Sequence, residues 1–592
     1  MSIKETQNIR DFLIENVLLK NSRRKLAPDS QRKLEYIRHG YVDKPLIYVG
    51  MNTCGKIAGA EKTFDKIAKY LKANSLDIEL IEGGCSGLCS VEPLVDIQLP
   101  NRNRISFGHI TYDKVQPLLD DVLKEKLPDG FAIGQYKSKS NRRWKNIPYI
   151  EDLPFFANQQ KIITKMCGVI DPVSVTEYIA NGGYKSFINT INQKTPSQVC
   201  SIIYQSQLQG RGGGEFPTGK KWSIALSTPS EQTYLVCNAV ESDPGSYMNR
   251  HIIESMPHKL IEAVLIAAYA TKATKAFIFI RKEFDLSIKR LKQALKEAYD
   301  FGLIGHNIFD SGVNINIVIK EGARAFVCGE ETALNNSIEG KRAMPYTKPP
   351  YPAQRGLWNK PTVVNNVETL INVPLIMKNG ADWYKKTGTK SSKGTKLFTL
   401  SGKTNNYGTF EVSMGTTFRD ILNNISNGLK SNQDFKAIIL GINSGNYITK
   451  EVLDKKVDFE ELKTIGSTLG SGAFVVVDQN TCMVALASYF SRFFKNESCG
   501  KCIPCREGTE QLFEMFQLAT TKFENQDTYK PNEIYKGIEQ IIELSKVMKD
   551  TSLCELGKSA PNAFLYTIHH FKSEFESHIY ERNCPANVCN ID

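Results

Sequence analysis

Short apolar runs alternate along the middle of the chain with longer stretches in which apolar residues recur every three or four positions. TYLVCNAV (233–240) and KAFIFIR (275–281) are apolar enough to be buried strands, and HKLIEAVLIAAYATKA (258–273) between them has helical periodicity. Strands that alternate with helices pair in a parallel sheet whose faces the helices cover. We therefore predict an α/β core, typical of nucleotide binding, over residues 161–392.

The pattern differs on either side of this core. On the N-terminal side, KPLIYVG (44–50) predicts a strand, AEKTFDKIAKYLKAN (60–74) a helix, and DIELIEGGCSGLCSVEPLVDIQL (77–99) two strands around a cysteine loop. This order in so short a stretch predicts a thioredoxin-like domain. On the C-terminal side, short strands surround one helix, FRDILNNISNGL (418–429), which predicts a β-grasp-like module. Helical periodicity in the remainder predicts a helical bundle, so the fold class is multidomain α/β.

A chain of 592 residues is too long for one hydrophobic core, so several domains are expected. The predicted divisions are a polar leader (1–43), the thioredoxin-like domain (44–125), a linker (126–160), the α/β core (161–392), the β-grasp-like module (393–478), the helical bundle (479–578) and a cysteine-containing tail (579–592). No apolar run approaches the roughly 18–20 residues that a membrane span needs, and the N-terminus lacks the features of a signal peptide. We expect a cytoplasmic protein without a direct membrane span.

The net charge of +12 is spread thinly along the chain. Short basic runs such as 20–25 and 137–143 are typical of solvated surface, and no basic face interleaved with aromatic residues is evident. Nucleic acid is therefore not an expected partner. A negatively charged partner subunit or a membrane surface would suit the charge, so the protein could be peripheral to a membrane through a complex.

The chain has 14 cysteines, too few for a disulfide scaffold at this length. Most lie in clusters, and clustered thiols in a cytosolic chain indicate metal or iron–sulfur ligation. The others stand alone, and we interpret them as small buried hydrophobic residues. The isolated cysteines are Cys167, Cys200, Cys237, Cys328 and Cys482.

The strongest chemical signal is a CxxCxxC loop at the start of a predicted helix. ESCGKCIPCREGT supplies Cys499, Cys502 and Cys505, and TSLCELGKSAPN supplies Cys554 further along. A 4Fe–4S cluster needs four soft anionic ligands from different directions, which suits this layout. Zinc could use the same thiolates, but the absence of a second CxxC pair favours the cluster. Basic residues that would offset its charge are Lys501, Arg506 and Lys558.

Further motifs identify a family. These are the glycine loop GRGGGEFPTGKKW (210–222), the stretch that runs from EGARAFVCGEET to AQRGLW (321–358), and PTVVNNVETL (361–370). Together with the four cysteines they resemble the NADH-binding flavoprotein subunit of respiratory complex I and its relatives in NAD-linked hydrogenases and formate dehydrogenases. The N-terminal domain resembles the small 2Fe–2S subunit of these enzymes, fused here as in the longer, bifurcating-hydrogenase type.

The resemblance implies hydride transfer from NADH to FMN, then one-electron transfer through the 4Fe–4S cluster to partner subunits, including a ferredoxin-like or 2Fe–2S subunit. It implies a Rossmann-like FMN/NADH domain and a β-grasp-like module of the SLBB type. By motif, Glu241, Glu330 and Glu331 are the candidate catalytic residues, and Phe216 and Tyr351 would flank the adenine of NADH. The cofactor-binding positions would be Gly210, Gly212, Gly213, Lys221, Asn238, Glu241, Gly329, Glu330, Asn365, Asn366 and Thr369.

Some positions depart from the family pattern. Glu215 and Arg324 replace glycines, Val240 replaces an acidic residue, and Asn249 replaces an aspartate. Since a lone buried charge is costly, we hypothesise an ion pair between Glu215 and Arg324 across the flavin pocket. In that case the pocket would be modified or lost, and the chain would act as an electron relay or structural subunit. Alternatively both side chains point outward and FMN binds normally.

Two further cysteine groups have incomplete ligand sets. The N-terminal domain offers only Cys54, Cys85 and Cys89, one thiol short of an all-cysteine 2Fe–2S site, so either a non-cysteine ligand completes the cluster or the domain serves for docking alone. In the tail, Cys584 and Cys589 could bind zinc with His578 or His570. Alternatively the tail thiols are free and the histidines only pack on a helix face.

Overall fold

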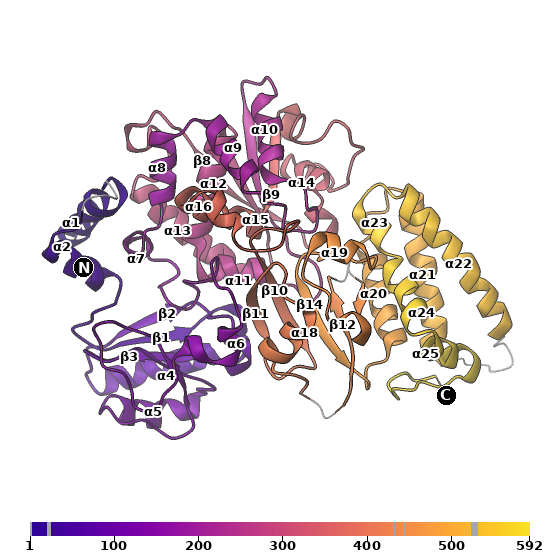
Figure 1. Ribbon diagram of the computed structural model, residues 1–592, viewed down its shortest axis with the longest axis horizontal. Helices are drawn as coiled ribbons and strands as arrows, with labels where there is room; N and C mark the ends of the chain where they lie inside the picture. Colours follow the sequence, from indigo (N-terminus) through magenta and orange to yellow (C-terminus); the bar gives the residue numbers. More distant parts are fainter. Residues whose placement is uncertain (1–2, 21–24, 431–432, 442–445, 523–530, 592) are drawn as a thin grey trace.

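The computed structural model describes residues 3–20, 25–430, 433–441, 446–522 and 531–591. The described residues form three separate β-sheets and a group of C-terminal helices, which follow one another along the chain (Figure 1). We call these parts the N-terminal, central and third sheet modules and the C-terminal helices. Each part has its own hydrophobic core, as expected of a multidomain α/β protein.

The N-terminal module is a mixed sheet with the strand order β2-β1-β3-β4-β5. β1 pairs in parallel with β2 and antiparallel with β3. All of β1 is buried, as its unbroken apolar run predicts. The elements are β1 (Leu46–Gly50), α3 (Thr53–Ile57), α4 (Ala60–Ala73), β2 (Glu79–Gly83), β3 (Val95–Gln98), β4 (Ile105–Phe107), α5 (Val115–Val122) and β5 (Ala132–Gln135).

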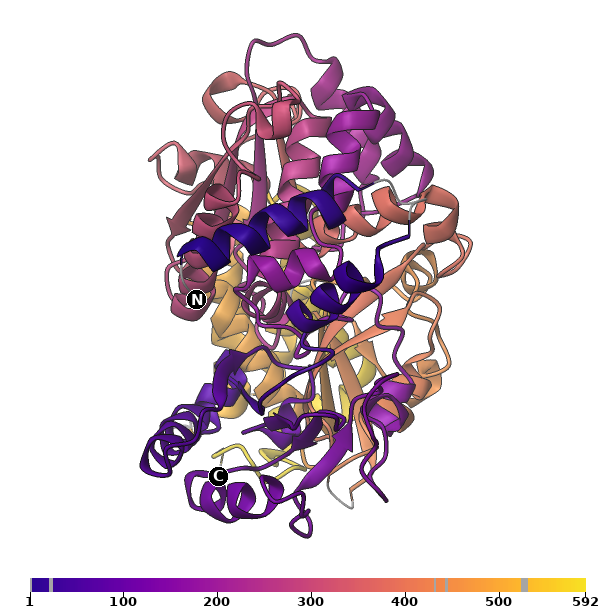
Figure 2. The same cartoon turned by 90° about the vertical axis from the view of Figure 1, so that its left-hand side faces the viewer.

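Two segments that we predicted as leader and linker are folded. The leader forms α1 (Ile3–Leu13) and α2 (Pro28–Ile37), which lie across the central module and bury Leu13 and Leu34 in its core (Figure 2). The linker contributes β5 to the first sheet, and its α6 (Pro154–Ala157) buries two phenylalanines in the core of the third sheet module. The chain between the modules is therefore packed against them.

The central module has a parallel sheet with the strand order β8-β7-β6-β9. Nearly every residue of α12 is buried, because this helix is apolar on all sides. The strands are β6 (Thr233–Ala239), β7 (Ala273–Arg281), β8 (Asn316–Gly322) and β9 (Thr362–Asn366). The helices are α7 (Val175–Ala180), α8 (Lys185–Gln193), α9 (Pro196–Gln205), α10 (Thr218–Ser227), α11 (Met248–Ser255), α12 (Pro257–Ala270), α13 (Asp285–Asp300), α14 (Glu331–Ile338), α15 (Val367–Ile371), α16 (Val373–Asn379) and α17 (Ala381–Lys385).

The third sheet module has the strand order β11-β10-β14-β12-β13, in which only β10 and β14 pair in parallel. Its elements are β10 (Thr395–Gly402), β11 (Gly408–Ser413), α18 (Phe418–Asp420), β12 (Phe435–Leu440), β13 (Tyr447–Ile448), α19 (Phe459–Lys463) and β14 (Ala473–Asp478). The C-terminal helices are α20 (Met483–Glu497), α21 (Ile503–Thr520), α22 (Pro531–Thr551), α23 (Glu555–Ser559), α24 (Asn562–His570) and α25 (Lys572–Glu576).

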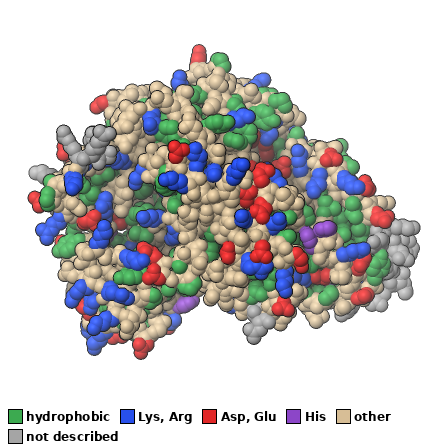
Figure 3. All heavy atoms as spheres, in the orientation of Figure 1, with side chains coloured by type: hydrophobic (Ala, Val, Ile, Leu, Met, Phe, Trp, Pro, Cys, Tyr) green, Lys and Arg blue, Asp and Glu red, His purple; other side chains and the backbone are tan. Residues whose placement is uncertain are grey.

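The surface agrees with the charge pattern of the sequence. On the face seen in Figure 3, Lys and Arg side chains are scattered among acidic ones and do not gather in one patch. A bilayer span takes a long, apolar helix, and none of the described helices is both long and apolar enough.

Candidate functional site

The predicted site residues gather at one edge of the parallel sheet. β6 and β9 pair in parallel, so their carboxyl ends lie side by side. Asn238 lies near the end of β6, and Asn365 and Asn366 end β9. The glycine loop reaches the same edge, because a Cβ added to Gly212 would lie 3.0 Å from the Cβ of Asn366. Ligands of open parallel sheets bind at this edge.

The glycine loop keeps its backbone open. The Gly210 N–H donates to the carbonyl oxygen of Phe216 at 3.0 Å and closes the loop. Gly213 has a φ of 99°, a conformation that favours glycine. A Cβ added to Gly214 would meet no atom within 4 Å. Because glycines leave N–H groups accessible to a phosphate or a flat ring, this loop fits a flavin.

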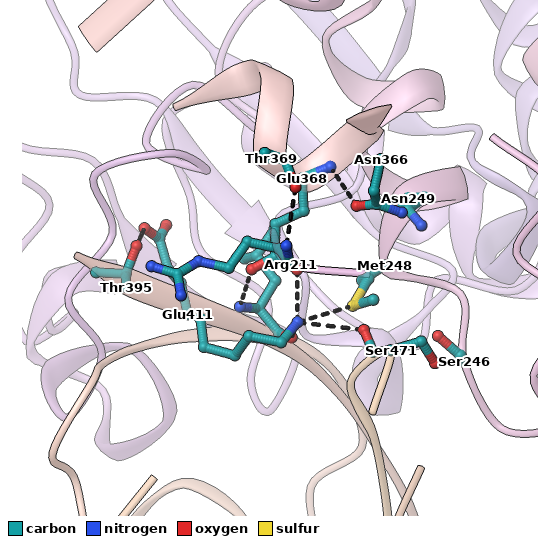
Figure 4. A network of polar contacts seen from close by, with 12 residues as sticks. Arg211, Ser246, Met248, Asn249, Asn366, Glu368, Thr369, Thr395, Glu411 and Ser471 are labelled. Carbon is teal, nitrogen blue, oxygen red and sulfur yellow. Dashed lines mark hydrogen bonds and ion pairs between the residues drawn. The ribbon is translucent and has the colours of Figure 1, made fainter. Parts of the chain in front are cut away.

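Arg211 holds the glycine loop in place through both its backbone and its side chain (Figure 4). Its N–H donates to Oγ1 of Thr369 at 2.8 Å. The residue is 1% exposed, and its guanidinium donates to the Tyr384 hydroxyl at 3.3 Å and to the Lys393 carbonyl oxygen. The sequence analysis missed this role, and the only signal for it is a long cationic side chain between glycines.

The two asparagines at the end of β9 connect the loop to its neighbouring helices. Nε1 of Trp222 in α10 donates to Oδ1 of Asn365 at 2.8 Å. The Glu368 N–H donates to Oδ1 of Asn366 at 2.9 Å, which caps the start of α15. Asn365, Asn366 and Thr369, which we predicted as cofactor-binding positions, therefore fix the glycine loop, α10 and α15 at the site.

A network of two lysines and two carboxylates borders the loop. Nζ of Lys221 lies 3.5 Å from Oε2 of Glu331 and 3.2 Å from the Val364 carbonyl oxygen. Nζ of Lys348 lies 3.2 Å from a carboxylate oxygen of Glu330 and 3.2 Å from one of Glu331. Burial raises the pKa of Glu331, but the two lysines outweigh it and hold this pKa below its ordinary value. The network places a lysine ammonium beside the loop, where a phosphate would lie.

The candidate catalytic carboxylates also position helices. Oε2 of Glu330 accepts the Thr332 and Ala333 N–H groups at 2.8 and 2.9 Å, at the start of α14. The two oxygens of Glu241 accept the Asn249 and Arg250 N–H groups, each at 2.7 Å, at the start of α11. Burial raises the pKa of Glu241. Glu241 is thus a positioning residue in this structure, whereas Glu330 and Glu331 face the lysine side chains.

Four further predicted positions, Asn238, Gly329, Phe216 and Tyr351, lie around this edge of the sheet or in solvent-accessible segments. Nδ2 of Asn238 donates to the Gly329 carbonyl oxygen at 2.8 Å, which brings the end of β6 to the CGEET segment. The two aromatic side chains expected to flank adenine are solvent-accessible, with Phe216 42% and Tyr351 54% exposed. Exposed aromatic rings can stack on a base.

The three cysteines of the CxxCxxC loop and Cys554 all lie at or near the ends of helices. Cys499 follows α20, Cys502 directly precedes α21, Cys505 lies in the first turn of α21, and Cys554 directly precedes α23. Burial raises the pKa of Cys505 to about 12 and that of Cys554 to about 11. Thiols in such surroundings become thiolates when a metal centre binds them.

This cysteine loop touches the segment that follows the CGEET motif. Nζ of Lys501 donates to the Pro345 carbonyl oxygen at 2.6 Å. An Arg342 guanidinium N–H lies 3.5 Å from the Cys499 carbonyl oxygen. The two sites predicted from the sequence are therefore neighbours in the structure.

Comparisons with known proteins agree with this geometry. The model of the Nuo51 FMN-binding domain matches residues 203–375, and that of the NADH-ubiquinone oxidoreductase-F iron–sulfur binding region matches residues 485–578. The NADP-reducing hydrogenase subunit HndC of Solidesulfovibrio fructosivorans is 46% identical over 431 residues, 73% of this chain and 86% of that protein. The NADH-quinone oxidoreductase F 2 subunit of Rhizobium meliloti (strain 1021) is 39% identical over 427 residues, 72% of this chain and 99% of that protein. The chain belongs to the NADH-quinone oxidoreductase F family.

A solved structure supports the fold of this family member. The crystal structure of an NAD⁺-reducing [NiFe]-hydrogenase in the H₂-reduced state matches with a TM-score of 0.62 and 24% identity, over 93% of this chain and 87% of that chain. The FMN-binding match contains the whole glycine loop and the β9 asparagines, and the iron–sulfur match contains all four clustered cysteines. FMN and a 4Fe–4S cluster, as predicted, are therefore its cofactors.

The predicted ion pair between Glu215 and Arg324 is wrong. Oε2 of Glu215 lies 3.2 Å from Nζ of Lys463 in α19, and Arg324 is exposed. The reason is that the glycine loop borders the third sheet module, since a Cβ added to Gly213 would lie 3.8 Å from Gly470. Glu215 therefore pairs with a lysine of that module instead of Arg324.

The other departures are buried in the scaffold of the site. Val240 is 1% exposed and packs under Gly329, whose added Cβ would lie 3.9 Å away. Asn249 donates its N–H to Glu241 at the start of α11. Neither side chain introduces a charge into the site.

The tail cysteines join a ligand group that differs from the predicted one. Ligand atoms of Cys482, His578, Cys584 and Cys589 lie within 4.8 Å of one another. Cys482, which we interpreted as a small hydrophobic residue, has its Sγ 3.3 Å from Nε2 of His578. His570 instead contacts Oδ1 of Asn446 at 3.2 Å. Cys584, Cys589 and His578 thus converge as one of the two predicted alternatives has it. The sequence analysis missed Cys482 because it lies far upstream in sequence, at the start of α20.

The three N-terminal thiols also converge. The Sγ atoms of Cys54, Cys85 and Cys89 lie within 4.8 Å of one another, at the start of α3 and in the loop after β2. By ligand type this group is compatible with iron–sulfur or metal binding.

Proposed function

We propose that this member of the NADH-quinone oxidoreductase F family is the NADH-oxidising, electron-input subunit of a multisubunit oxidoreductase. FMN held at the glycine loop would supply hydride acceptance from NADH and one-electron release, and Cys499, Cys502, Cys505 and Cys554 would hold the 4Fe–4S cluster through which electrons leave for partner subunits. The observation that carries the proposal is the contact between the two centres: the cluster loop donates to Pro345, in the same segment as Lys348, which binds Glu330 and Glu331.

The residues of the site would act by binding and orientation. The open glycine loop and Lys221 would hold the flavin phosphate, since they combine free N–H groups with an ammonium group. Glu330 and Glu331 would face the isoalloxazine and nicotinamide rings. Phe216 and Tyr351 would flank the adenine of NADH, and their exposure supports this role.

The module identities belong to the same proposal. The N-terminal, central and third sheet modules would be a thioredoxin-like domain, a Rossmann-like FMN/NADH domain and an SLBB-type β-grasp domain, and the C-terminal helices would be the cluster-bearing bundle. The partners would include a ferredoxin-like or 2Fe–2S subunit, and the complex would work in the cytoplasm, peripheral to a membrane where its partners require it. The net positive charge of the chain would suit contact with negatively charged partner subunits.

We propose further that Cys482, His578, Cys584 and Cys589 bind a structural zinc ion. Three thiolates and one imidazole are a common zinc ligand set. Nδ1 of His578 contacts the Glu574 carbonyl oxygen at 2.7 Å, which directs Nε2 toward the sulfur atoms. The ion would fix the tail to the start of α20.

A cofactor assay on the purified full-length chain tests the electron-input role. We expect about one FMN per chain and NADH-dependent reduction of ferricyanide. Lys221→Ala should lose most of the FMN, whereas Lys220→Ala, at the exposed neighbouring position, should retain it. A chain that binds no FMN after reconstitution, or a Lys221→Ala variant that binds it normally, would overturn the proposal and favour the relay or structural role.

A further inference from the structure

A carboxylate lies beside the N-terminal thiol group, close to Cys54 but not within 4.8 Å of all three sulfurs. Glu92 follows the cysteine loop and is 7% exposed. Its Oε1 lies 3.9 Å from Sγ of Cys54. Its Oε2 accepts the Leu94 N–H at 2.9 Å, which fixes the carboxylate with one oxygen toward the thiols. Ligating carboxylates are commonly held by such an outer hydrogen bond.

Two glycines leave room for this carboxylate. A Cβ added to Gly50 would lie 3.0 Å from Oε2 of Glu92, and one added to Gly55 would lie 3.1 Å from it. No lysine or arginine among the described residues forms an ion pair with Glu92. A buried carboxylate beside three thiols is costly unless a cation lies among them.

The spacing of the sulfur atoms indicates one ion. A tetrahedral zinc site with Zn–S bonds of about 2.3 Å separates its sulfurs by about 3.8 Å. In a two-iron cluster the ligands divide between two irons, so some sulfurs must lie farther apart. The three N-terminal sulfurs all lie within 4.8 Å of one another, whereas the four cysteines of the 4Fe–4S region form no such group among the described residues.

We propose that Cys54, Cys85, Cys89 and Glu92 bind a single tetrahedral divalent metal ion. Three thiolates and one carboxylate are ligands that Zn²⁺ accepts in this geometry. When the ion is Zn²⁺, which has no redox chemistry, such a centre carries no electrons. The N-terminal module would then have a structural centre where the family resemblance implies a redox cluster.

The position of the site gives the ion a role in holding modules together. On one side, the cysteine loop pairs with the third sheet module: Leu88 forms a β-bridge with Gly408, and the Thr409 N–H donates to the Gly87 carbonyl oxygen at 2.9 Å. A Cβ added to Gly408 would lie 1.9 Å from that oxygen, so the backbones are in close contact.

On the other side, the start of α3 binds the central module. Nδ2 of Asn52 donates to Oγ of Ser255 at 2.8 Å, and the Thr53 N–H donates to Oε2 of Glu254 at 2.8 Å. An ion held by Cys54 and the cysteine loop therefore joins two of the segments through which the N-terminal module contacts its neighbours. This role is independent of the proposed NADH oxidation.

Metal analysis of the full-length chain tests the proposal. We expect about two zinc ions, one at each converging group, and about four irons with matching sulfide. Cys85→Ser should lose one zinc and no iron, and Glu92→Gln should weaken that zinc roughly tenfold or more. Cys200→Ser, at a buried thiol outside the clusters, should change neither metal. Two further irons and sulfides in the wild-type chain, absent in Cys85→Ser, would overturn the proposal in favour of a 2Fe–2S cluster.

Zinc X-ray absorption of the wild-type chain covers a variant that fails to fold, and hydrogen exchange in a folded variant tests the role of the ion. The X-ray absorption should give three sulfurs and one oxygen or nitrogen per zinc, with imidazole ring scattering from half of the zinc ions only. Hydrogen exchange in Cys85→Ser should speed up in the cysteine loop and at Tyr407–Thr409, and not in α20–α22. Imidazole scattering from every zinc ion, or unchanged exchange at the module contacts, would contradict the proposed site or its role.

Discussion

Replacing Lys396 by methionine should be among the most damaging single changes outside the cofactor sites. Nζ of Lys396 lies 2.5 Å from Oε2 of Glu368, and both side chains are at most 1% exposed. The ammonium also donates to the Leu397 and Ser471 carbonyl oxygens at 2.9 and 3.2 Å. The pair joins α15 of the central module to β10 of the third sheet module.

The expected magnitude follows from the charge left behind. Removing one partner of a buried ion pair costs about 3–5 kcal/mol of unfolding free energy, because the other charge stays buried without compensation. Lys396→Met leaves Glu368, whose pKa burial already raises. At pH values above the ordinary glutamate pKa, Glu368 must either ionise in an apolar site or keep its proton. The loss of unfolding free energy should therefore grow as pH rises. The double variant Lys396→Met, Glu368→Gln leaves neither charge of the pair buried, so it should recover most of the lost unfolding free energy.

Urea unfolding, followed by tryptophan fluorescence and by release of FMN, measures these differences. Glu368 lies next to Thr369, which accepts the Arg211 N–H, so the single variant should also release FMN at lower urea. Lys390→Met, at an exposed position, is the matched control and should change stability by less than about 1 kcal/mol. The reasoning is refuted if Lys396→Met behaves like the control, or if the double variant is no more stable than the single one.

Three further outcomes are expected. Glu215→Gly should leave FMN content unchanged and stability within about 1 kcal/mol, because the Lys463 partner is 51% exposed and such pairs contribute little; a large gain in FMN content would mean that Glu215 obstructs the pocket. Burial raises the pKa of Glu177 to about 8 from 4.5, so the unfolding free energy should fall as pH rises between these values, and Glu177→Gln should abolish that slope in pH-dependent denaturation. Cys584→Ser should lose one zinc and lower the thermal midpoint of unfolding, whereas His570→Ala should retain the metal. Zinc loss in His570→Ala would instead favour the alternative in which His570 is a ligand.

Local sequence patterns predict much of this fold. The apolar runs at 44–50 and 233–240 contain the strands β1 and β6, and the run at 275–281 covers all but the first two residues of β7, because an unbroken apolar run suits a strand covered on both faces. The CxxCxxC motif also locates its site, since its three ligands lie within a few residues of the start of α21. In these places neighbours in sequence are neighbours in space.

The predictions fail where contacts join distant segments. Cys482 and His578 are 96 positions apart, and no local spacing relates them. Glu215 finds Lys463 only because the glycine loop borders another module. The leader contains apolar residues at helical spacing, such as Leu13 and Leu34, but its many charges give it the composition of a polar segment. These leucines become buried only because the leader packs on the core of the central module.

The carboxylate of Glu411 in β11 has a consequence for the order in which the chain folds on the ribosome. It accepts the N–H groups of Ile163 and Thr164 at 3.0 and 2.9 Å, in the segment that precedes the central module. These buried donors emerge from the ribosome long before their acceptor is synthesised. The central module therefore cannot reach its final state during its own translation. An incomplete nascent chain would expose this segment to chaperones and proteases, and synthesis of β11 ends that exposure.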